Sequence, residues 1–340
     1  MLKRSLIAGA SVLALAPAAN AQDCELTISV YSFAQDEFDE ILYTPFEEET
    51  GCEVIVETGN SVERLAKIAA NRENPVIDMA VVSVHDALEA SRDGLLQTID
   101  TGALENFDKL YDLAKDPLGN GEAIGYTFYA TSIAYRTDKV EVTSWGDLLS
   151  EELAGNVAFP DVTTNQGPPA LYMLGKALGD DDTSLETPME ELGEHSDDIV
   201  TFYVRSSQLA QLMMQEEIWA APIGRFAWGQ FKDSGLPIAW AEPEEGQTGG
   251  LNVMVMTANN GNEELATRFM DYWLSTEVQT KLAEGLVDSP ANAEVTVSDE
   301  AADNLTYGAE TVAQLDLLPP EAIVDNREAW IEQWNALVVQ

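Results

Sequence analysis

The apolar positions in the first third of the chain change period along the sequence, and the change predicts alternating strands and helices. Residues 26–30 form a short run that is typical of a buried strand. Over residues 36–50 the apolar positions recur at helical spacing until Gly51 ends the pattern. The runs at 54–56 and 79–82 repeat the strand signal, with a helical segment between them. This order predicts a parallel sheet with helices packed on its faces.

A similar pattern starts again after residue 143 and predicts a second α/β unit. Ser144 is typical of a helix N-cap, 157–159 predicts a strand, and 171–177 predicts an apolar helix. Between the two units, the Thr- and Tyr-rich segment 123–136 predicts an extended hinge strand. A second extended stretch at 236–257 predicts that the chain crosses back to the first unit.

The fold class expected from these patterns is α/β with two lobes. Each lobe is expected to be a mostly parallel sheet flanked by helices, and two hinge strands are expected to join them. A helix over 326–337, with Trp330 and Trp334 one turn apart, is expected to pack back on the structure with both indoles in the core. The expected boundaries are 1–21 for a signal peptide, 22–131 and 252–295 for the N-terminal lobe, and 132–251 and 296–340 for the C-terminal lobe.

The first residues predict export. The basic pair at 3–4, the apolar run at 6–16 and the A-x-A site at 19–21 together are typical of a cleaved secretory signal peptide. The apolar run is shorter than the ~20 residues that span a bilayer. Cys24 follows Gln22-Asp23 rather than small residues, so cleavage is favoured over lipid anchoring. We therefore expect a soluble periplasmic protein that starts at Gln22.

The charge of the chain argues against two classes of partner. The sequence holds 17 basic and 60 acidic residues, for a net charge of −43. Nucleic acid and anionic lipid are therefore poor partners. Because the acidic residues are spread along the chain, the sequence favours a hydrated acidic surface, as in a saline habitat, over a dedicated site for cations.

The two cysteines predict a disulfide. Cys24 and Cys52 each precede a predicted strand at the same offset, so neighbouring parallel strands would bring them together in an oxidising compartment. His85 and His195 are the sequence's two histidines, which argues against zinc sites and Cys/His catalysis. No G-x-S-x-G motif is present. The sequence therefore predicts neither an enzyme nor a bound metal or cofactor.

Ligands of open α/β sheets bind beyond the carboxyl ends of the strands, and this rule selects candidate residues in the first lobe. Tyr31 and Ser32 follow the first predicted strand, and Asn60 follows the second. Ser83 and His85 follow the third. Structural roles are the alternative: Asn60 also fits a helix cap.

The second lobe contributes a polar loop at 161–169 and a helix start. Asp161 is the loop's carboxylate, and Asn165 and Gln166 lie beside it before Pro168. Ser207 lies at the start of a predicted helix, where it can bind ligand or cap the helix.

Six short motifs occur in a fixed order along nearly the whole chain after the signal peptide, and their order resembles that of a known family. They lie at 45–51 (PFEEETG), 63–67 (ERLAK), 74–78 (NPVID), 94–100 (GLLQTID), 143–149 (TSWGDLL) and 243–246 (PEEG).

Their order and spacing resemble type II periplasmic binding proteins of ABC importers, most closely the spermidine/putrescine-binding group, with iron- and phosphonate-binding relatives next. The resemblance implies an extracytoplasmic solute-binding component that captures a small polar organic ligand, most simply a polyamine or related organic amine. It also implies permease subunits in the inner membrane as partners and a monomeric chain.

Three positions depart from the polyamine group. Arg225 stands where the group has an aromatic residue, and Gly250 and Asn252 stand where it has an aromatic and an acidic residue. Asp288 lies near the position of a family aromatic, and we expect it to replace some of the lost acidity. Arg225 inside a closing cleft needs a protein carboxylate or an anionic ligand group. The alternative ligand is therefore an anionic or zwitterionic solute such as a phosphonate; ferric ion is disfavoured because the sequence has no Tyr-Tyr pair.

Overall fold

A computed structural model describes residues 24–59, 61–205, 208–232 and 234–338. The expected signal peptide at 1–21 lies outside this part, as do the candidate residues Asn60 and Ser207. In the part described, none of the helices has the length and hydropathy of a membrane span.

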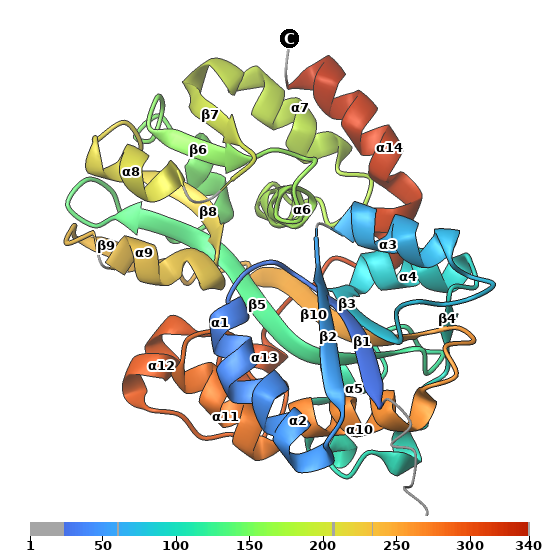
Figure 1. The fold of residues 1–340 in the computed structure, drawn as a ribbon. Helices are drawn as coiled ribbons and strands as arrows, with labels where there is room; N and C mark the ends of the chain where they lie inside the picture. The colour runs from blue at the N-terminus through green and yellow to red at the C-terminus, as the bar shows by residue number, and fades with distance from the viewer. Residues whose placement is uncertain (1–23, 60, 206–207, 233, 339–340) are drawn as a thin grey trace, which may run out of the picture.

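A mixed sheet of ten strands runs through both lobes of the described structure (Figure 1). Its order is β2-β1-β3-β10-β5-β8-β6-β7, with β4 beside β10 and β9 beside β5. The predicted α/β class is confirmed. The strands are β1 (Glu25–Val30), β2 (Glu53–Thr58), β3 (Met79–Ser83), β4 (Leu96–Gln97), β5 (Ala123–Arg136), β6 (Val157–Pro160), β7 (Ile199–Tyr203), β8 (Ala220–Gly224), β9 (Ile238–Trp240) and β10 (Thr248–Thr257).

The helices cover the faces of this sheet (Figure 1). The α-helices are α1 (Gln35–Phe38), α2 (Thr44–Thr50), α3 (Ser61–Ala70), α4 (Val84–Arg92), α5 (Asp112–Lys115), α6 (Gly167–Ala177), α7 (Glu186–Glu194), α8 (Leu209–Met214), α9 (Trp228–Lys232), α10 (Glu263–Trp273), α11 (Thr276–Glu284), α12 (Asp299–Asn304), α13 (Ala309–Ala313) and α14 (Pro320–Leu337). Short 3-10 turns are η2 (Thr101–Ala103), η3 (Phe107–Lys109), η4 (Trp145–Leu149), η5 (Ser196–Asp198) and η7 (Arg225–Ala227).

The predicted helix at 36–50 is interrupted by a π-helical turn, η1 (Asp39–Tyr43), between α1 and α2. Pro45 lies in the first turn of α2. It has no N–H to donate to the turn before it, and the widened turn lies directly before this proline. Ser144 is the expected N-cap, but it caps the short 3-10 turn η4 through a capping box with Asp147.

The first lobe is built on the parallel strands β2, β1 and β3. Leu26 pairs with Val54, and Ile28 pairs with both Val56 and Met79. Cys24 and Cys52 form a disulfide, with their Cα atoms 4.6 Å apart, directly before the paired strands β1 and β2. The disulfide predicted from the shared offset of the cysteines is therefore confirmed.

Two long strands join the lobes. β5 has the bounds expected for the first hinge strand; its first part pairs with β10 and its last part with β8 and β9. The second extended stretch expected at 236–257 is divided into β9 and β10, with Pro243 and Gly246 in the turn between them.

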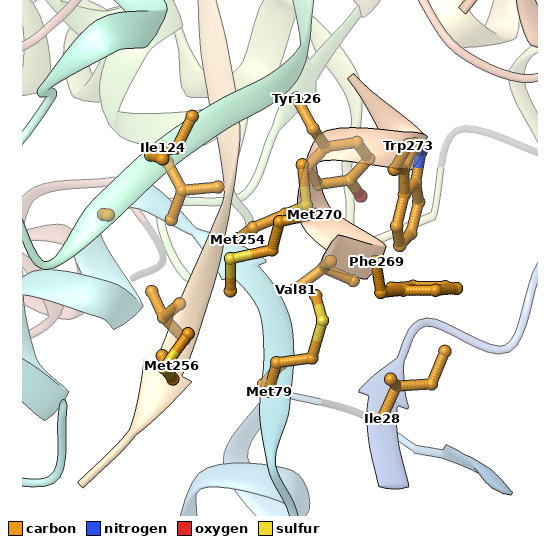
Figure 2. Close-up of a cluster of buried hydrophobic side chains, with 14 of the residues drawn as sticks. Ile28, Met79, Val81, Ile124, Tyr126, Met254, Met256, Phe269, Met270 and Trp273 are labelled. Carbon is orange, nitrogen blue, oxygen red and sulfur yellow. The ribbon is translucent and has the colours of Figure 1, made fainter. Parts of the chain in front are cut away.

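Each lobe has its own hydrophobic core. The core of the first lobe gathers side chains from β1, β3, β5, β10 and α10, including Met79, Tyr126 and Trp273 (Figure 2). The core of the second lobe contains Trp330 and Trp334, so the expectation that these indoles are core residues is confirmed.

The last part of the chain is shared between the two cores. Val312 of α13 packs into the first core, whereas Leu318 and Trp330 pack into the second. This packing favours a return to the second lobe after α13, later than the expected boundary at residue 296.

Candidate ligand site

The candidate site lies where the first lobe faces the second. The strands β2 and β3 lead directly into α3 and α4, and α4 contacts α14 of the second lobe (Figure 1). The carboxyl ends of β1 and β3 therefore lie at the side of the first lobe where a ligand between the lobes would bind.

Tyr31 follows β1 and stacks with an arginine that sequence reasoning did not select. The guanidinium carbon of Arg64 on α3 lies 4.5 Å from the centroid of the Tyr31 ring. Burial is the main cause that raises the pKa of Tyr31 to about 12, and the nearby carboxylate of Asp86 acts in the same direction. The Tyr31 hydroxyl is therefore neutral at all physiological pH values.

The carboxylate of Asp288 is buried: 5% of the residue's surface is exposed. Its side chain hydrogen-bonds the side chain of Thr127 on β5, but its Oδ2 atom has no partner among the described residues. Burial raises the pKa of Asp288 to about 7. Burial raises the pKa values of the neighbouring Tyr43 and Tyr126 hydroxyls, and the charge of Asp288 adds to both shifts. Asp288 thus offers an unused acceptor in an apolar setting.

Ser83 and His85 lie at the start of α4. Ser83 caps the helix, because its hydroxyl accepts a hydrogen bond from the Asp86 backbone N–H. His85 lines a small cavity with Asn165 and Arg327 of the second lobe. Burial lowers the pKa of His85 below its usual range, although Asp86 and a hydrogen bond with Asn165 oppose the shift. The His85–Asn165 pair therefore links the two lobes.

Two candidate residues of the second-lobe loop already have hydrogen-bond donors within the protein. The Asp161 carboxylate accepts a hydrogen bond from the backbone N–H of Thr163 at 2.9 Å. The side-chain oxygen of Gln166 accepts from the hydroxyl of Tyr203 and from the backbone N–H of Gly224, both at 3.0 Å. These contacts hold the loop against β7 and β8.

Arg225 is held between the lobes by protein contacts. Its Nη2 atom donates to the backbone carbonyl of Asp303 on α12 at 2.7 Å. Its guanidinium carbon lies 4.5 Å from the ring centroid of Trp240 and 5.5 Å from that of Trp228. Burial lowers the pKa of Arg225 to about 10. The contacts that hold it are a carbonyl and two indoles, and its buried Nε atom has no partner among the described residues. The sequence predicted a protein carboxylate or an anionic ligand group here; the carboxylates of Asp303 and Glu242 act on the charge of the guanidinium without bonding it.

Ser32 and Asn252 complete the set of described candidates. Ser32 is exposed beside Tyr31. Asn252 lies on β10 between Ser83 of β3 and Thr127 of β5, next to a register shift in the β10–β5 pairing. This irregularity is typical of strands near binding sites.

The side chain of Tyr129, on the neighbouring strand β5, fills the space beside Gly250. A Cβ atom on Gly250 would lie 2.4 Å from the hydroxyl of Tyr129, so the Tyr129 side chain occupies this space. The Tyr129 ring meets the ring of Phe226 edge to face at 5.3 Å. Phe226 is 59% exposed. This pair was not selected from the sequence. The Tyr-rich composition of the hinge strand, which contains Tyr129, was the signal that could have found it.

Arg64 is the other residue that sequence reasoning missed. It lies one turn before the buried Ile68 on α3, and it is itself 4% exposed. A charged residue on the apolar face of a helix was the signal that could have found it.

Taken together, two cores, two hinge strands and a polar cluster at the strand ends define a two-lobed binding protein. A family model described as "Bacterial extracellular solute-binding protein" matches residues 42–308. The chain belongs to this family. It is a solute-binding protein of the ABC transporter type and not an enzyme, as the sequence predicted.

Particular relatives agree with this assignment. The chain is 28% identical to the spermidine/putrescine-binding periplasmic protein of Escherichia coli strain K12, over 91% of both chains. It resembles the crystal structure of an ABC transporter from Clostridium perfringens with a TM-score of 0.85 and 30% identity, over 92% of this chain and 99% of that one. It shares the fold of a Streptococcus pneumoniae spermidine/putrescine ABC transporter substrate-binding protein, with a TM-score of 0.75 and 21% identity over 93% and 98% of the chains.

Proposed function

We propose that this chain is the periplasmic solute-binding component of an ABC importer, and that its solute is a polyamine or a related organic amine. In this proposal the monomeric protein delivers the amine to permease subunits in the inner membrane. The end-to-end similarity to the spermidine/putrescine-binding protein of Escherichia coli supports it.

The observation that carries the proposal is the unpartnered oxygen of Asp288. A buried carboxylate without a cation is costly, because burial removes the water that stabilises its charge. An ammonium group on the ligand would supply the missing charge and the missing hydrogen bond. The aromatic rings of Tyr129 and Phe226 offer faces and edges for the carbon chain of such a ligand.

The test is calorimetric titration of the mature protein with spermidine, putrescine and related amines. We expect Asp288→Asn, which keeps the shape and removes the charge, to weaken amine binding by roughly 30- to 1000-fold, the loss expected for a buried charge-assisted hydrogen bond.

A second variant controls for non-specific attraction of cations to this acidic chain. Asp197→Asn removes one negative charge from an exposed residue of η5 in the second lobe. We expect it to leave amine affinity within about threefold of the wild type, because exposed charges are screened by salt. Equal losses in the two variants would contradict the proposal.

A further inference from the structure

Arg64 is anchored at one of its three guanidinium nitrogens. Its Nη1 atom donates to the carbonyl oxygen of Ser29 on β1 at 3.1 Å and to that of Val81 on β3 at 2.7 Å. These two contacts fix the plane of the guanidinium at the carboxyl ends of two neighbouring strands. The guanidinium carbon lies over the ring of Tyr31, 4.5 Å from its centroid.

The other edge of the guanidinium is unused. Nε and Nη2 are buried, and neither has a hydrogen-bond partner among the described residues. The Tyr31 side chain hydrogen-bonds the guanidinium and Asp86 acts on its charge, but Nε and Nη2 themselves stay without a partner among the described residues. Nε and Nη2 lie on one edge of the planar group, and their N–H bonds point in parallel. This is the geometry that holds both oxygens of a carboxylate.

The unused edge of Arg64 and the unused oxygen of Asp288 belong to one polar cluster. Arg64 is anchored on β3, Asp288 hydrogen-bonds Thr127 of β5, and β10, which pairs with both strands, is the one strand between them. The Tyr126 hydroxyl lies near both charges: burial raises its pKa most, Asp288 raises it further and Arg64 lowers it. The cluster thus combines a buried pair of donors with a buried acceptor, each without a partner among the described side chains.

We propose that the solute is an amine that also carries a carboxylate, with the carboxylate bound to Nε and Nη2 of Arg64 and the ammonium group bound to Asp288. This inference rests on the proposed function and narrows its ligand class to the amino carboxylates. A phosphonate fits less well, since it brings a third oxygen for which Arg64 has no free donor edge. Arg64 is then the residue that distinguishes an amino acid from a diamine of the same length.

The test compares ligands that differ at one end. Calorimetry on the wild-type protein measures affinities for α,ω-diamines of increasing length and for the ω-amino carboxylates in which one ammonium end is replaced by a carboxylate, such as 1,4-diaminobutane against 4-aminobutanoate. We expect the amino carboxylate of the best length to bind at least ~10-fold more tightly than its matched diamine. This comparison needs no variant.

Variants of Arg64 then assign the preference to this residue. We expect Arg64→Gln to weaken binding of the amino carboxylate at least ~30-fold and to change diamine binding less than about threefold. Arg64→Lys keeps the charge but loses the two parallel donors, and we expect a partial loss. Arg268→Gln, at a half-exposed arginine paired with Glu49, is the matched control for the charge change.

The outcomes separate this inference from the function on which it rests. If diamines bind and amino carboxylates of the same lengths do not, the amine function stands and the role of Arg64 is overturned. If neither set binds, both proposals fail. A wild-type preference for amino carboxylates that Arg64→Gln leaves unchanged would also overturn the assignment to Arg64.

Discussion

The two halves of the candidate site differ in how their polar groups are satisfied. In the first lobe, Arg64 and Asp288 are buried and keep unpartnered atoms. In the second lobe, Asp161 and Gln166 accept hydrogen bonds from their own loop and from neighbouring strands. Arg225 on that side keeps an unpartnered Nε atom, but a backbone carbonyl and two indoles hold its guanidinium. Burying an unsatisfied charge lowers stability, whereas satisfying it locally raises stability. On the strength of this difference we propose that Arg64 and Asp288 recognise the charged groups of the ligand and that the second-lobe loop supplies a preformed wall.

The largest expected effect on stability concerns Asp288. Its folded-state pKa of about 7 lies above the ~3.9 of an unfolded aspartate, so the folded protein holds this proton more tightly. The stability of the ligand-free protein should therefore fall as pH rises from about 4 to about 7. Asp288→Asn should remove this loss and raise the free energy of unfolding at pH 8 by about 2–4 kcal/mol.

Chemical denaturation of the wild type and Asp288→Asn between pH 5 and pH 8 checks this prediction. His85 acts with the opposite sign, because its lowered pKa costs stability as pH falls below about 6.5. The difference between the two proteins isolates Asp288. If Asp288→Asn is less stable than the wild type at pH 8, the Asp288 charge does not destabilise the ligand-free protein, and the contrast drawn between the two halves is wrong.

Replacing Gln166 should lower stability and leave ligand affinity almost unchanged, the reverse of the effects expected for Asp288. Gln166→Leu removes the acceptor for the Tyr203 hydroxyl and for the Gly224 N–H, and should lower the free energy of unfolding by about 2–3 kcal/mol. Ligand affinity of the folded fraction should change by less than about threefold. Urea denaturation and calorimetry on one preparation measure both quantities; a large loss of affinity without loss of stability would place Gln166 on the ligand.

Arg225 is the second-lobe counterpart of Arg64: it is a partly buried cation, and contacts within the protein hold it. Arg225→Leu removes stacking on Trp228 and Trp240 and the bond to the Asp303 carbonyl, and should lower the free energy of unfolding by about 1–2 kcal/mol. We expect a smaller change in ligand affinity than for Arg64→Gln. Thermal unfolding measures the stability change and titration measures the affinity change. A larger loss of affinity in Arg225→Leu than in Arg64→Gln would indicate that Arg225, and not Arg64, binds the ligand.

The smallest expected effect is at the surface contact between α4 and α14. Arg92 and Asp325 form an exposed ion pair there. Because such pairs contribute little in water, Asp325→Asn should lower the free energy of unfolding by less than about 1 kcal/mol, with the effect vanishing in high salt. Denaturation at low and high ionic strength measures it.

Much of the fold follows from the sequence because short apolar runs, glycine stops and cysteine offsets are local signals. They are sufficient to predict the bounds of β5, the parallel strands and the Cys24–Cys52 bond. The site is less predictable, because a carboxylate's role depends on which donors the fold brings near it. Asp161 has its donors two residues away, whereas Asp288 depends on Thr127 of a distant strand. Arg64 was missed because its burial depends on the carbonyls of β1 and β3.

The most direct test of ligand recognition by Arg64 and Asp288 is a crystal structure of the protein with the amino carboxylate that binds most tightly in solution. We expect both carboxylate oxygens to lie within hydrogen-bonding distance of Nε and Nη2 of Arg64, and the ammonium group to lie within hydrogen-bonding distance of Oδ2 of Asp288. A complex in which the charged ends of the ligand are bound by Asp161 and Arg225, with Arg64 and Asp288 untouched, would contradict it.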